Sequence, residues 1–323
     1  MTNGTAGTIR TVLGDVDPAT LGATNTHEHL FQVSPLLPGD DLDDPELSQA
    51  EAADLVESGF TAMIDATPIG LGRRPADVAR ISAAVGLTVV ASTGVHREAH
   101  YPAGHPMHTV SVAKRTALFR RDLTEAMPIS DDVTHPTERA VGPQGADVRA
   151  GLIKCGIGYW SISGFERSTL EAAGEVHRET GAPVMVHLEH CTAAHELLDL
   201  LVRCGVAPYR VMLAHADRLL DPGLHVELIA RGAYLGYDGA ARARNHSDAA
   251  LIDLTEAVLA AGGTRIVLGA DVARASRYLA YGGMPGLAYL GRRYLPRLEA
   301  RIGADAVHQI LVQNPRELLT WAH

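Results

Sequence analysis

The stretch Ile266-Val267-Leu268-Gly269-Ala270-Asp271 is a short apolar run that ends in a carboxylate. Seven earlier runs share its apolar character, and most are rich in Val, Ile and Leu, which is typical of strands that are buried on both faces. Strands are therefore expected at Ala23–Leu30, Ala62–Ala66, Thr88–Val95, Leu152–Gly156, Val184–Leu188, Val211–His215, Ala233–Tyr237 and Ile266–Asp271.

Segments with the apolar spacing of amphipathic helices lie between these runs. Glycines such as Gly59, Gly86 and Gly181 stand where a helix should end and the next strand begin. Helices are expected at Pro45–Ser58, Val110–Ala126, Thr169–Glu179, Thr192–Cys204, Pro222–Ala230, Ser247–Ala261 and Leu287–Arg301.

Strands that alternate with helices pair in parallel, and eight such strands close a (β/α)₈ barrel. We therefore predict an α/β protein that folds as one distorted TIM barrel over residues 1–323. An open doubly wound sheet is the alternative fold. Such a sheet usually carries a glycine-rich phosphate loop after its first strand, whereas this chain has Asn25-Thr26-His27-Glu28-His29 there.

The charge balance and the cysteine content narrow the class of protein. The chain carries 28 Lys and Arg against 38 Asp and Glu, a net charge of −10, which disfavours nucleic acid and anionic membranes as partners. Three cysteines do not make a disulfide framework and indicate a reducing compartment. Residues 1–15 lack a signal-peptide pattern, and no apolar run is long enough to cross a bilayer. We expect a cytoplasmic protein that acts on a small molecule.

Several potential metal ligands stand at the ends of the expected strands. His27 and His29 are two residues apart on the first strand, so their side chains point to the same face. His187, His215 and Asp271 end the fifth, sixth and eighth strands. In a barrel these positions share the C-terminal rim, where catalytic residues collect. Four imidazoles and a carboxylate at one rim suit divalent transition metals.

Lys154 is unusual because it lies inside the apolar run Leu152-Ile153-Lys154-Cys155. A lysine that reaches solvent from the end of a strand is one interpretation. The other is a buried lysine whose lowered pKa leaves a neutral amine. Such an amine can react with carbon dioxide to form a carbamate, which is an anionic ligand with two oxygens and can bridge two metal ions.

Seven segments together resemble the phosphotriesterase-related family, the branch of the amidohydrolase superfamily that holds phosphotriesterases and phosphotriesterase-like lactonases. The resemblance runs from about Thr11 to the C-terminus. It rests on Thr26-His27-Glu28-His29-Leu30, Gly151-Leu152-Ile153-Lys154-Cys155-Gly156, Gly181-Ala182-Pro183-Val184-Met185-Val186-His187, Ala214-His215-Ala216-Asp217-Arg218, Gly232-Ala233-Tyr234-Leu235, Leu268-Gly269-Ala270-Asp271 and Gln313-Asn314-Pro315.

The resemblance implies an amidohydrolase-like barrel with two divalent metal ions, zinc being the expected metal, and a homodimer as the assembly. It implies that His27, His29 and Asp271 hold the more buried ion and that His187 and His215 hold the more exposed one. Lys154, carboxylated by CO2, would bridge the two ions together with a hydroxide. Lys154 and Asp271 are thus the expected catalytic residues, with Asp271 passing the proton of the hydroxide toward the leaving group.

The expected substrate pocket lies in the loops after the last two strands, which are rich in arginine. Some similar family members hydrolyse sugar lactones that carry a phosphate, which implies Arg244, Arg274 and Tyr278 as substrate-binding residues. Tyr159-Trp160, after the fourth strand, is expected to line the pocket. The histidine-rich segment His96–His108 is interpreted as a lid, with a third metal site as the alternative.

We therefore expect a binuclear-metal hydrolase of ester bonds, a lactonase or esterase whose substrate is a sugar lactone that can carry a phosphate. A phosphotriesterase and an acyl-homoserine lactonase are the alternatives within this class. Only 5% of the residues are aromatic, which disfavours the aromatic pocket that a synthetic phosphotriester needs. A ligand-binding barrel without catalysis is a remote alternative, because all six expected ligands are present.

Overall fold

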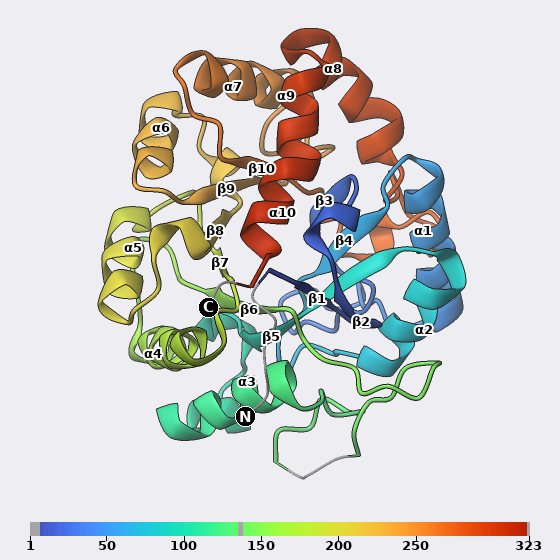
Figure 1. Ribbon diagram of the computed structural model, residues 1–323, viewed down its shortest axis with the longest axis vertical. Helices are drawn as coiled ribbons and strands as arrows, with labels where there is room; N and C mark the ends of the chain where they lie inside the picture. The colour runs from blue at the N-terminus through green and yellow to red at the C-terminus, as the bar shows by residue number, and fades with distance from the viewer. Residues whose placement is uncertain (1–6, 135–137, 322–323) are drawn as a thin grey trace.

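Eight parallel strands form a barrel in the computed structural model, which describes residues 7–134 and 138–321 (Figure 1). Each strand pairs with its neighbour in chain order. The strands are β3 Thr24–Glu28, β4 Ala62–Asp65, β5 Thr88–Val95, β6 Leu152–Gly156, β7 Val184–His187, β8 Val211–Ala214, β9 Tyr234–Tyr237 and β10 Ile266–Leu268. This topology confirms the expected TIM barrel and excludes the doubly wound sheet. The ends of the predicted 1–323 domain, residues 1–6 and 322–323, lie outside the described residues.

The last strand returns to the first and nearly closes the barrel. The backbone N–H of Asp271, just after β10, donates to the carbonyl oxygen of His27 in β3 (2.9 Å). The two strands approach so closely that a Cβ atom on Gly269 would lie 2.7 Å from the Cβ of His27. Glycine at this position therefore allows the contact that brings the two strand ends together.

Helices surround the barrel, and their apolar faces pack on the outer side of the strands (Figure 1). They are α1 Pro45–Glu57, α2 Pro75–Val85, α3 Val112–Thr124, α4 Gly164–Thr180, α5 Ala194–Arg203, α6 Pro222–Ala230, α7 Asp248–Ala260, α8 Leu295–Ile302, α9 Ala304–His308 and α10 Asn314–Leu319.

Two expected helices need correction, and α2, α9 and α10 lie outside the expected ranges. Helix α2 ends at Gly86, which takes the left-handed conformation of a C-cap. Helix α4 begins five residues earlier than expected, because Ser163 and Glu166 form a capping box through reciprocal hydrogen bonds. The last expected helix, Leu287–Arg301, is a π-helical turn at Leu290–Tyr294 followed by α8.

The inside of the barrel is apolar near the N-terminal ends of the strands and polar near their C-terminal ends. The apolar layer consists of Ile64, Val90, Leu152, Met185, Met212, Tyr234 and Val267. Lys154 lies two residues beyond Leu152, and His187 lies two beyond Met185. Since side chains alternate along a strand, these polar groups point inward above the apolar layer.

A short hairpin that the sequence analysis did not predict covers the N-terminal end of the barrel. Strands β1 Ile9–Thr11 and β2 Gly14–Val16 pair antiparallel, and they lie beside α10 in the front of Figure 1. Ile9 packs with Leu318 and Leu319 of α10 against the interior apolar layer. This end of the barrel is therefore closed, and the opposite end is open.

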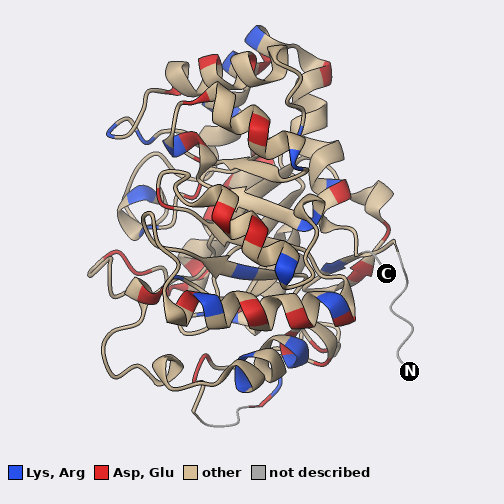
Figure 2. Ribbon diagram, turned by 90° about the vertical axis from the view of Figure 1, so that its left-hand side faces the viewer, with Lys and Arg blue, Asp and Glu red and all other residues tan. Residues whose placement is uncertain are grey.

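The surface carries both signs of charge. On the face seen in Figure 2, acidic and basic side chains are mixed along the helices. Within residues 7–134 and 138–321, no helix is long and apolar enough to cross a membrane.

The closed end of the barrel provides a test of the fold. Trp321 is buried, its Nε1–H donates to the carbonyl oxygen of Gly151 (2.9 Å), and the guanidinium of Arg10 lies 4.2 Å from the centre of its ring. Trp321→Ala should lower the free energy of unfolding by about 3–5 kcal/mol, because it leaves a cavity and an unpaired carbonyl. Denaturant unfolding measures the change. Trp160→Ala is the control, since that side chain is 67% exposed, and equal losses in the two variants would contradict the assignment.

Candidate metal centre

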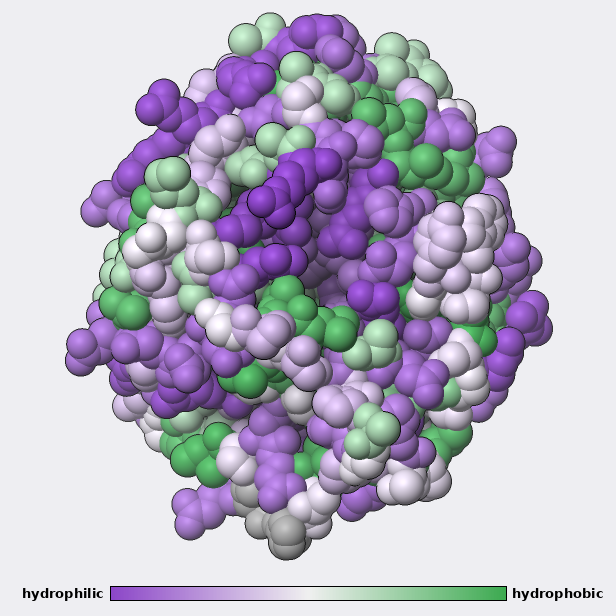
Figure 3. All heavy atoms as spheres, turned by 180° about the vertical axis from the view of Figure 1, so that it is seen from behind, coloured by the Kyte–Doolittle hydropathy of each residue, from purple (hydrophilic) through white to green (hydrophobic). Residues whose placement is uncertain are grey.

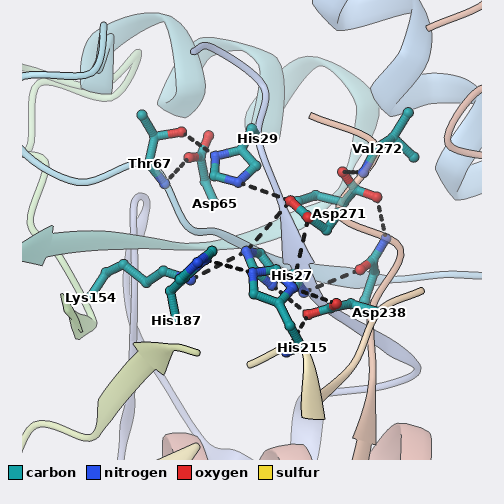
Figure 4. A network of polar contacts seen from close by, with 12 residues as sticks. His27, His29, Asp65, Thr67, Lys154, His187, His215, Asp238, Asp271 and Val272 are labelled. Carbon is teal, nitrogen blue, oxygen red and sulfur yellow. Dashed lines mark hydrogen bonds and ion pairs between the residues drawn. The ribbon is translucent and has the colours of Figure 1, made fainter. Parts of the chain in front are cut away.

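The six side chains expected as metal ligands lie together at the C-terminal end of the barrel (Figure 4). All of them are buried: His27, His29, Lys154, His187, His215 and Asp271. Lys154 Nζ lies 3.3 Å from His27 Nε2, and His215 Nε2 lies 2.9 Å from His187 Nδ1. The strand-end pattern in the sequence therefore identified one spatial cluster.

One part of the cluster is a compact group of three potential ligands. His27, His29 and Asp271 each offer an atom, and these atoms lie within 4.8 Å of one another. Asp271 Oδ1 is 3.4 Å from His29 Nε2 and 3.7 Å from His27 Nε2. Two imidazole nitrogens and a carboxylate oxygen at this spacing suit a divalent transition metal.

The tautomer of His29 leaves its Nε2 free to bind a cation. Its Nδ1 lies 2.8 Å from Thr67 Oγ1, and the hydroxyl of Thr67 donates its own hydrogen to the carbonyl oxygen of Phe31. Thr67 must then accept from His29, so the ring hydrogen is on Nδ1 and the lone pair is on Nε2. A hydrogen bond of this kind behind the ring is typical of metal-binding histidines.

Asp238, which the sequence analysis did not select as a site residue, orients two more of the imidazoles. The Nδ1–H of His27 donates to Asp238 Oδ2 (2.8 Å), and the Nδ1–H of His215 donates to Asp238 Oδ1 (2.6 Å). Burial would raise the pKa of Asp238, but its interactions with His215 and His27 hold that pKa well below its usual value. Asp238 directly follows the expected strand Ala233–Tyr237, and Asp271 ends the expected strand Ile266–Asp271, so both stand as polar residues at the end of an apolar run.

His187 presents the opposite ring nitrogen to the site. Its Nε2 is 2.7 Å from Glu189 Oε1, which leaves Nδ1 facing His215 Nε2. Burial lowers the pKa of both His27 and His187 to about 4. The rings are thus neutral at neutral pH and keep lone pairs for a metal ion.

Lys154 is fully buried, and its only hydrogen-bond neighbour among the described residues is His27. No carboxylate of the described chain lies within ion-pair distance of its nitrogen. Burial lowers its pKa to about 8. A buried amine that has one hydrogen-bond neighbour and no carboxylate to balance its charge fits a lysine that is modified or that interacts with bound ions.

Two of the expected ligands stand in left-handed backbone conformations at the rim of the barrel. His215 and Asp271 both have positive φ angles, 62° and 45°. The preceding Ala214 faces the barrel interior, so a regular strand would direct His215 outward. The left-handed conformation instead brings the His215 ring to Asp238. Such backbone strain in non-glycine residues is concentrated at functional sites.

A pocket of about 280 Å³ opens above the cluster, and Figure 3 shows the hollow rimmed mainly by hydrophilic side chains. Leu36, Leu37 and Leu71 form an apolar part of its wall. The basic lining consists of Arg97, Arg218, Arg242 and Arg274, and the acidic lining consists of Glu189 and Asp271. The excess of arginine makes the pocket suitable for an anionic ligand.

Comparison with known proteins agrees with this geometry. The model of the phosphotriesterase family matches residues 7–319. The chain belongs to the phosphotriesterase family. It is 28% identical to a phospho-furanose lactonase of Mycoplasmopsis agalactiae, over 97% of this chain and 91% of that protein.

Solved structures of family members share the fold. A lactonase from Listeria monocytogenes superimposes with a TM-score of 0.87 at 28% identity, covering 98% of this chain and all of the other. A phosphotriesterase homology protein from Escherichia coli, complexed with phosphate in its active site, gives a TM-score of 0.81 at 27% identity over 94% of this chain and all of that one. The expected family, barrel fold and class of hydrolases acting on ester bonds are confirmed, and the family is one of metal-dependent hydrolases.

Of the three residues expected to bind substrate, one lines the pocket and two do not. Arg274 lines the pocket, but Arg244 is exposed and is not part of the lining. The chain turns after β9, where the N–H of Arg242 donates to the carbonyl oxygen of Gly239, and this turn directs Arg242 rather than Arg244 to the site. Tyr278 is fully buried outside the pocket, and its hydroxyl donates to the carbonyl oxygen of His29.

Two other expectations concern the pocket wall. His96 and His100 of the histidine-rich segment line the pocket, with their ring centres 3.8 Å apart. Among the described residues they belong to no group of three close metal ligands, so a third metal site has no geometric support. Tyr159 and Trp160 do not line this pocket and instead line a neighbouring hollow.

Asp238 gives the first test of the site. Asp238→Asn should lower metal affinity about 10- to 100-fold, because an amide cannot accept from both imidazoles as a carboxylate does. Metal retained at graded concentrations of a chelator measures the effect. Asp253→Asn, on the exposed face of α7, is the control. Unchanged metal retention in Asp238→Asn would contradict the orienting role.

Proposed function

We propose that the protein is a metal-dependent lactonase that hydrolyses an anionic lactone, with a phosphorylated sugar lactone as the leading substrate. The observation that carries the proposal is the position of four arginines around a pocket whose floor is the histidine and aspartate cluster. The names of the lactonase relatives support the reaction class.

The proposed ligand assignment is the one that the family resemblance implies, and the clustering of these buried side chains supports it. His27, His29 and Asp271 would hold one divalent ion, and His187 and His215 would hold a second, with zinc as the proposed metal. Two such ions, when bound, supply a hydroxide nucleophile at neutral pH and polarise the carbonyl group of the substrate. Lys154 would link the two positions as a carbamate.

The protein's own residues contribute proton transfer. Asp271 lies at the floor of the pocket, and its Oδ2 pairs with the guanidinium of Arg242 (2.5 Å). Burial would raise the pKa of Asp271, but Arg242 and the neighbouring histidines hold it well below the usual value. Asp271 therefore stays ionised and can accept a proton during attack, then deliver it to the alkoxide that leaves as the ring opens.

Substrate orientation would depend mainly on Arg274. Its guanidinium makes no hydrogen bond or ion pair within the part of the chain that the structure describes, so it is available to a phosphate. Arg242 and Arg218 already contact Asp271. The apolar wall around Leu36 and Leu71 would cover the carbon face of the ring.

A substrate panel tests the reaction class. Metal-loaded protein is assayed with phosphorylated sugar lactones, neutral lactones, acyl-homoserine lactones, aryl esters and phosphotriesters. The highest kcat/KM is expected for a phosphorylated lactone. A higher value for a phosphotriester or an acyl-homoserine lactone would overturn the proposal in favour of that class.

The proposed carbamate on Lys154 can be tested directly, because Lys114 is the only other lysine of the chain and a signal from lysine can therefore be assigned. Lys154→Ala should remove most of the activity and lower the metal content, and short carboxylic acids should partly restore both by supplying oxygen ligands. Lys114→Ala, which alters an exposed side chain, is the control. Carbon NMR with labelled CO2 should show one carbamate signal that disappears in Lys154→Ala. A metal-replete and fully active Lys154→Ala enzyme would refute the bridging role.

Arg274 tests the recognition of an anion. A charge-assisted contact with phosphate contributes about 1.5–3 kcal/mol, so Arg274→Ala should reduce kcat/KM roughly ten- to a hundredfold on a phosphorylated lactone. The matched lactone without phosphate should lose little. Arg244→Ala is the control, because that side chain lies outside the pocket. Equal losses on both lactones would remove the support for an anion site, and a larger loss in Arg244→Ala would restore that residue to the pocket.

A further inference from the structure

A second hollow adjoins the catalytic pocket and shares one wall with it. Its volume is about 570 Å³, and it is lined by Tyr159, Trp160, Glu189, His190, Thr192 and Leu219. Glu189 also lines the catalytic pocket. A substrate bound above the metal centre could therefore extend past Glu189 into this hollow. A volume of this order is within the usual range for small-molecule sites.

The aromatic side chains of the hollow are exposed to an unusual degree. Trp160 is 67% exposed and Tyr159 is 61% exposed, and among the large hydrophobic residues of the described chain only Met284 exceeds them. Their ring centres lie 6.4 Å apart in a nearly perpendicular arrangement. Side chains of this size are normally buried, and those that remain exposed together often mark a binding site.

The loop that carries these rings is fixed to its neighbour. The backbone N–H of Trp160 donates to Thr192 Oγ1 (3.0 Å), and the same hydroxyl donates to the carbonyl oxygen of Glu189 (2.6 Å). Trp160 and His190 both have positive φ angles, 50° and 51°. Strained backbone of this kind persists only where surrounding contacts hold it, so the backbone that carries the indole is held in place by the fold.

The chemistry of the lining differs from that of the catalytic pocket. No Lys or Arg lines the second hollow among the described residues, whereas four arginines line the first. The charge of Glu189 is balanced on the catalytic side by Arg97 (3.2 Å) and Arg218 (4.0 Å). The second hollow thus offers aromatic faces together with the hydroxyl of Thr192, the ring of His190 and the carboxylate of Glu189, and among the described residues it has no cationic side chain of Lys or Arg to select an anion.

We propose that this hollow is a subsite for an uncharged sugar ring attached to the part of the substrate that is hydrolysed. A sugar ring has an apolar C–H face that packs on an aromatic ring and hydroxyl groups along its edge that hydrogen-bond to Glu189, Thr192 and His190. The substrate would then be a glycosylated lactone, with its ester over the metal centre. This inference rests on the proposed lactonase function and extends its substrate class.

The kinetic test compares two lactones that differ by one ring. Cellobionolactone is a gluconolactone that carries a glucosyl ring, and gluconolactone lacks it. In Trp160→Ala, the ratio of kcat/KM for cellobionolactone to kcat/KM for gluconolactone should fall about three- to tenfold, as expected for the loss of one stacking contact. Tyr209→Ala is the matched control, because Tyr209 is also exposed (55%) but lies in the turn Pro208–Arg210 before β8, at the closed end of the barrel. A ratio that does not change in Trp160→Ala contradicts the subsite.

A binding test that needs no hydrolysis separates this inference from the proposed function. The chain has two tryptophans, and Trp321 is only 5% exposed, so fluorescence quenching by acrylamide reports mainly on Trp160. Cellobiose should protect Trp160 from the quencher. Protection without hydrolysis of any lactone would leave the subsite standing while the lactonase proposal fails. Hydrolysis of lactones without protection by cellobiose would overturn the subsite alone.

Two further results would assign the hollow to a different ligand or to a subunit contact. Protection by phenol but not by cellobiose would overturn the sugar ring in favour of an aromatic group. Conversion of a dimer into a monomer by Trp160→Ala, measured by sedimentation, would show that the aromatic pair is a contact between subunits and would also overturn the subsite.

Discussion

The carboxylate of Asp238 is the group on which the arrangement of the candidate metal centre depends. It accepts the Nδ1–H of His27 in β3 and the Nδ1–H of His215 just after β8, two residues that are far apart in the sequence. One buried side chain therefore fixes the orientation and tautomer of two imidazoles. A carboxylate suits this task because its two oxygens accept both hydrogens and its charge strengthens both bonds. The barrel makes the contact possible because it brings all strand ends to one rim.

The two ends of the barrel have complementary physical roles. At the N-terminal end the hairpin, α10 and the interior apolar layer exclude water and stabilise the fold. At the C-terminal end the chain buries Lys154, Asp238 and Asp271 and holds several residues in left-handed conformations. Each of these features is costly, and each persists because strands anchored in the apolar layer hold the rim in place. Stability and chemistry are thus separated along the barrel axis.

The sequence predicted the strands and the six clustered side chains because polar residues interrupt or end the apolar runs, and because parallel strands bring their C-terminal ends to one rim. Arg242 was not predicted, since its direction depends on a turn at Gly239 rather than on strand periodicity. The orientation of His215 depends on one left-handed residue. The N-terminal hairpin was not predicted because each of its strands has only three residues, which is too few to show an alternating apolar pattern. Asp238 also stands at the end of an apolar run, as the expected ligands do, but it lies in none of the segments that carry the family resemblance.

The charge around the catalytic pocket differs in sign from the net charge of the chain. The chain has a net charge of −10, yet arginine is in excess around the catalytic pocket. At physiological ionic strength the Debye length is about 8 Å, so a substrate anion in the mouth of the pocket experiences the nearby arginines more strongly than the distant acidic surface. The arginines therefore dominate the local field at the pocket, even though the net charge of the chain is negative. Glu189 lies at the border of this field. Its carboxylate pairs with Arg97 and Arg218 on the catalytic side, and it also lines the second hollow, which has no Lys or Arg among the described residues.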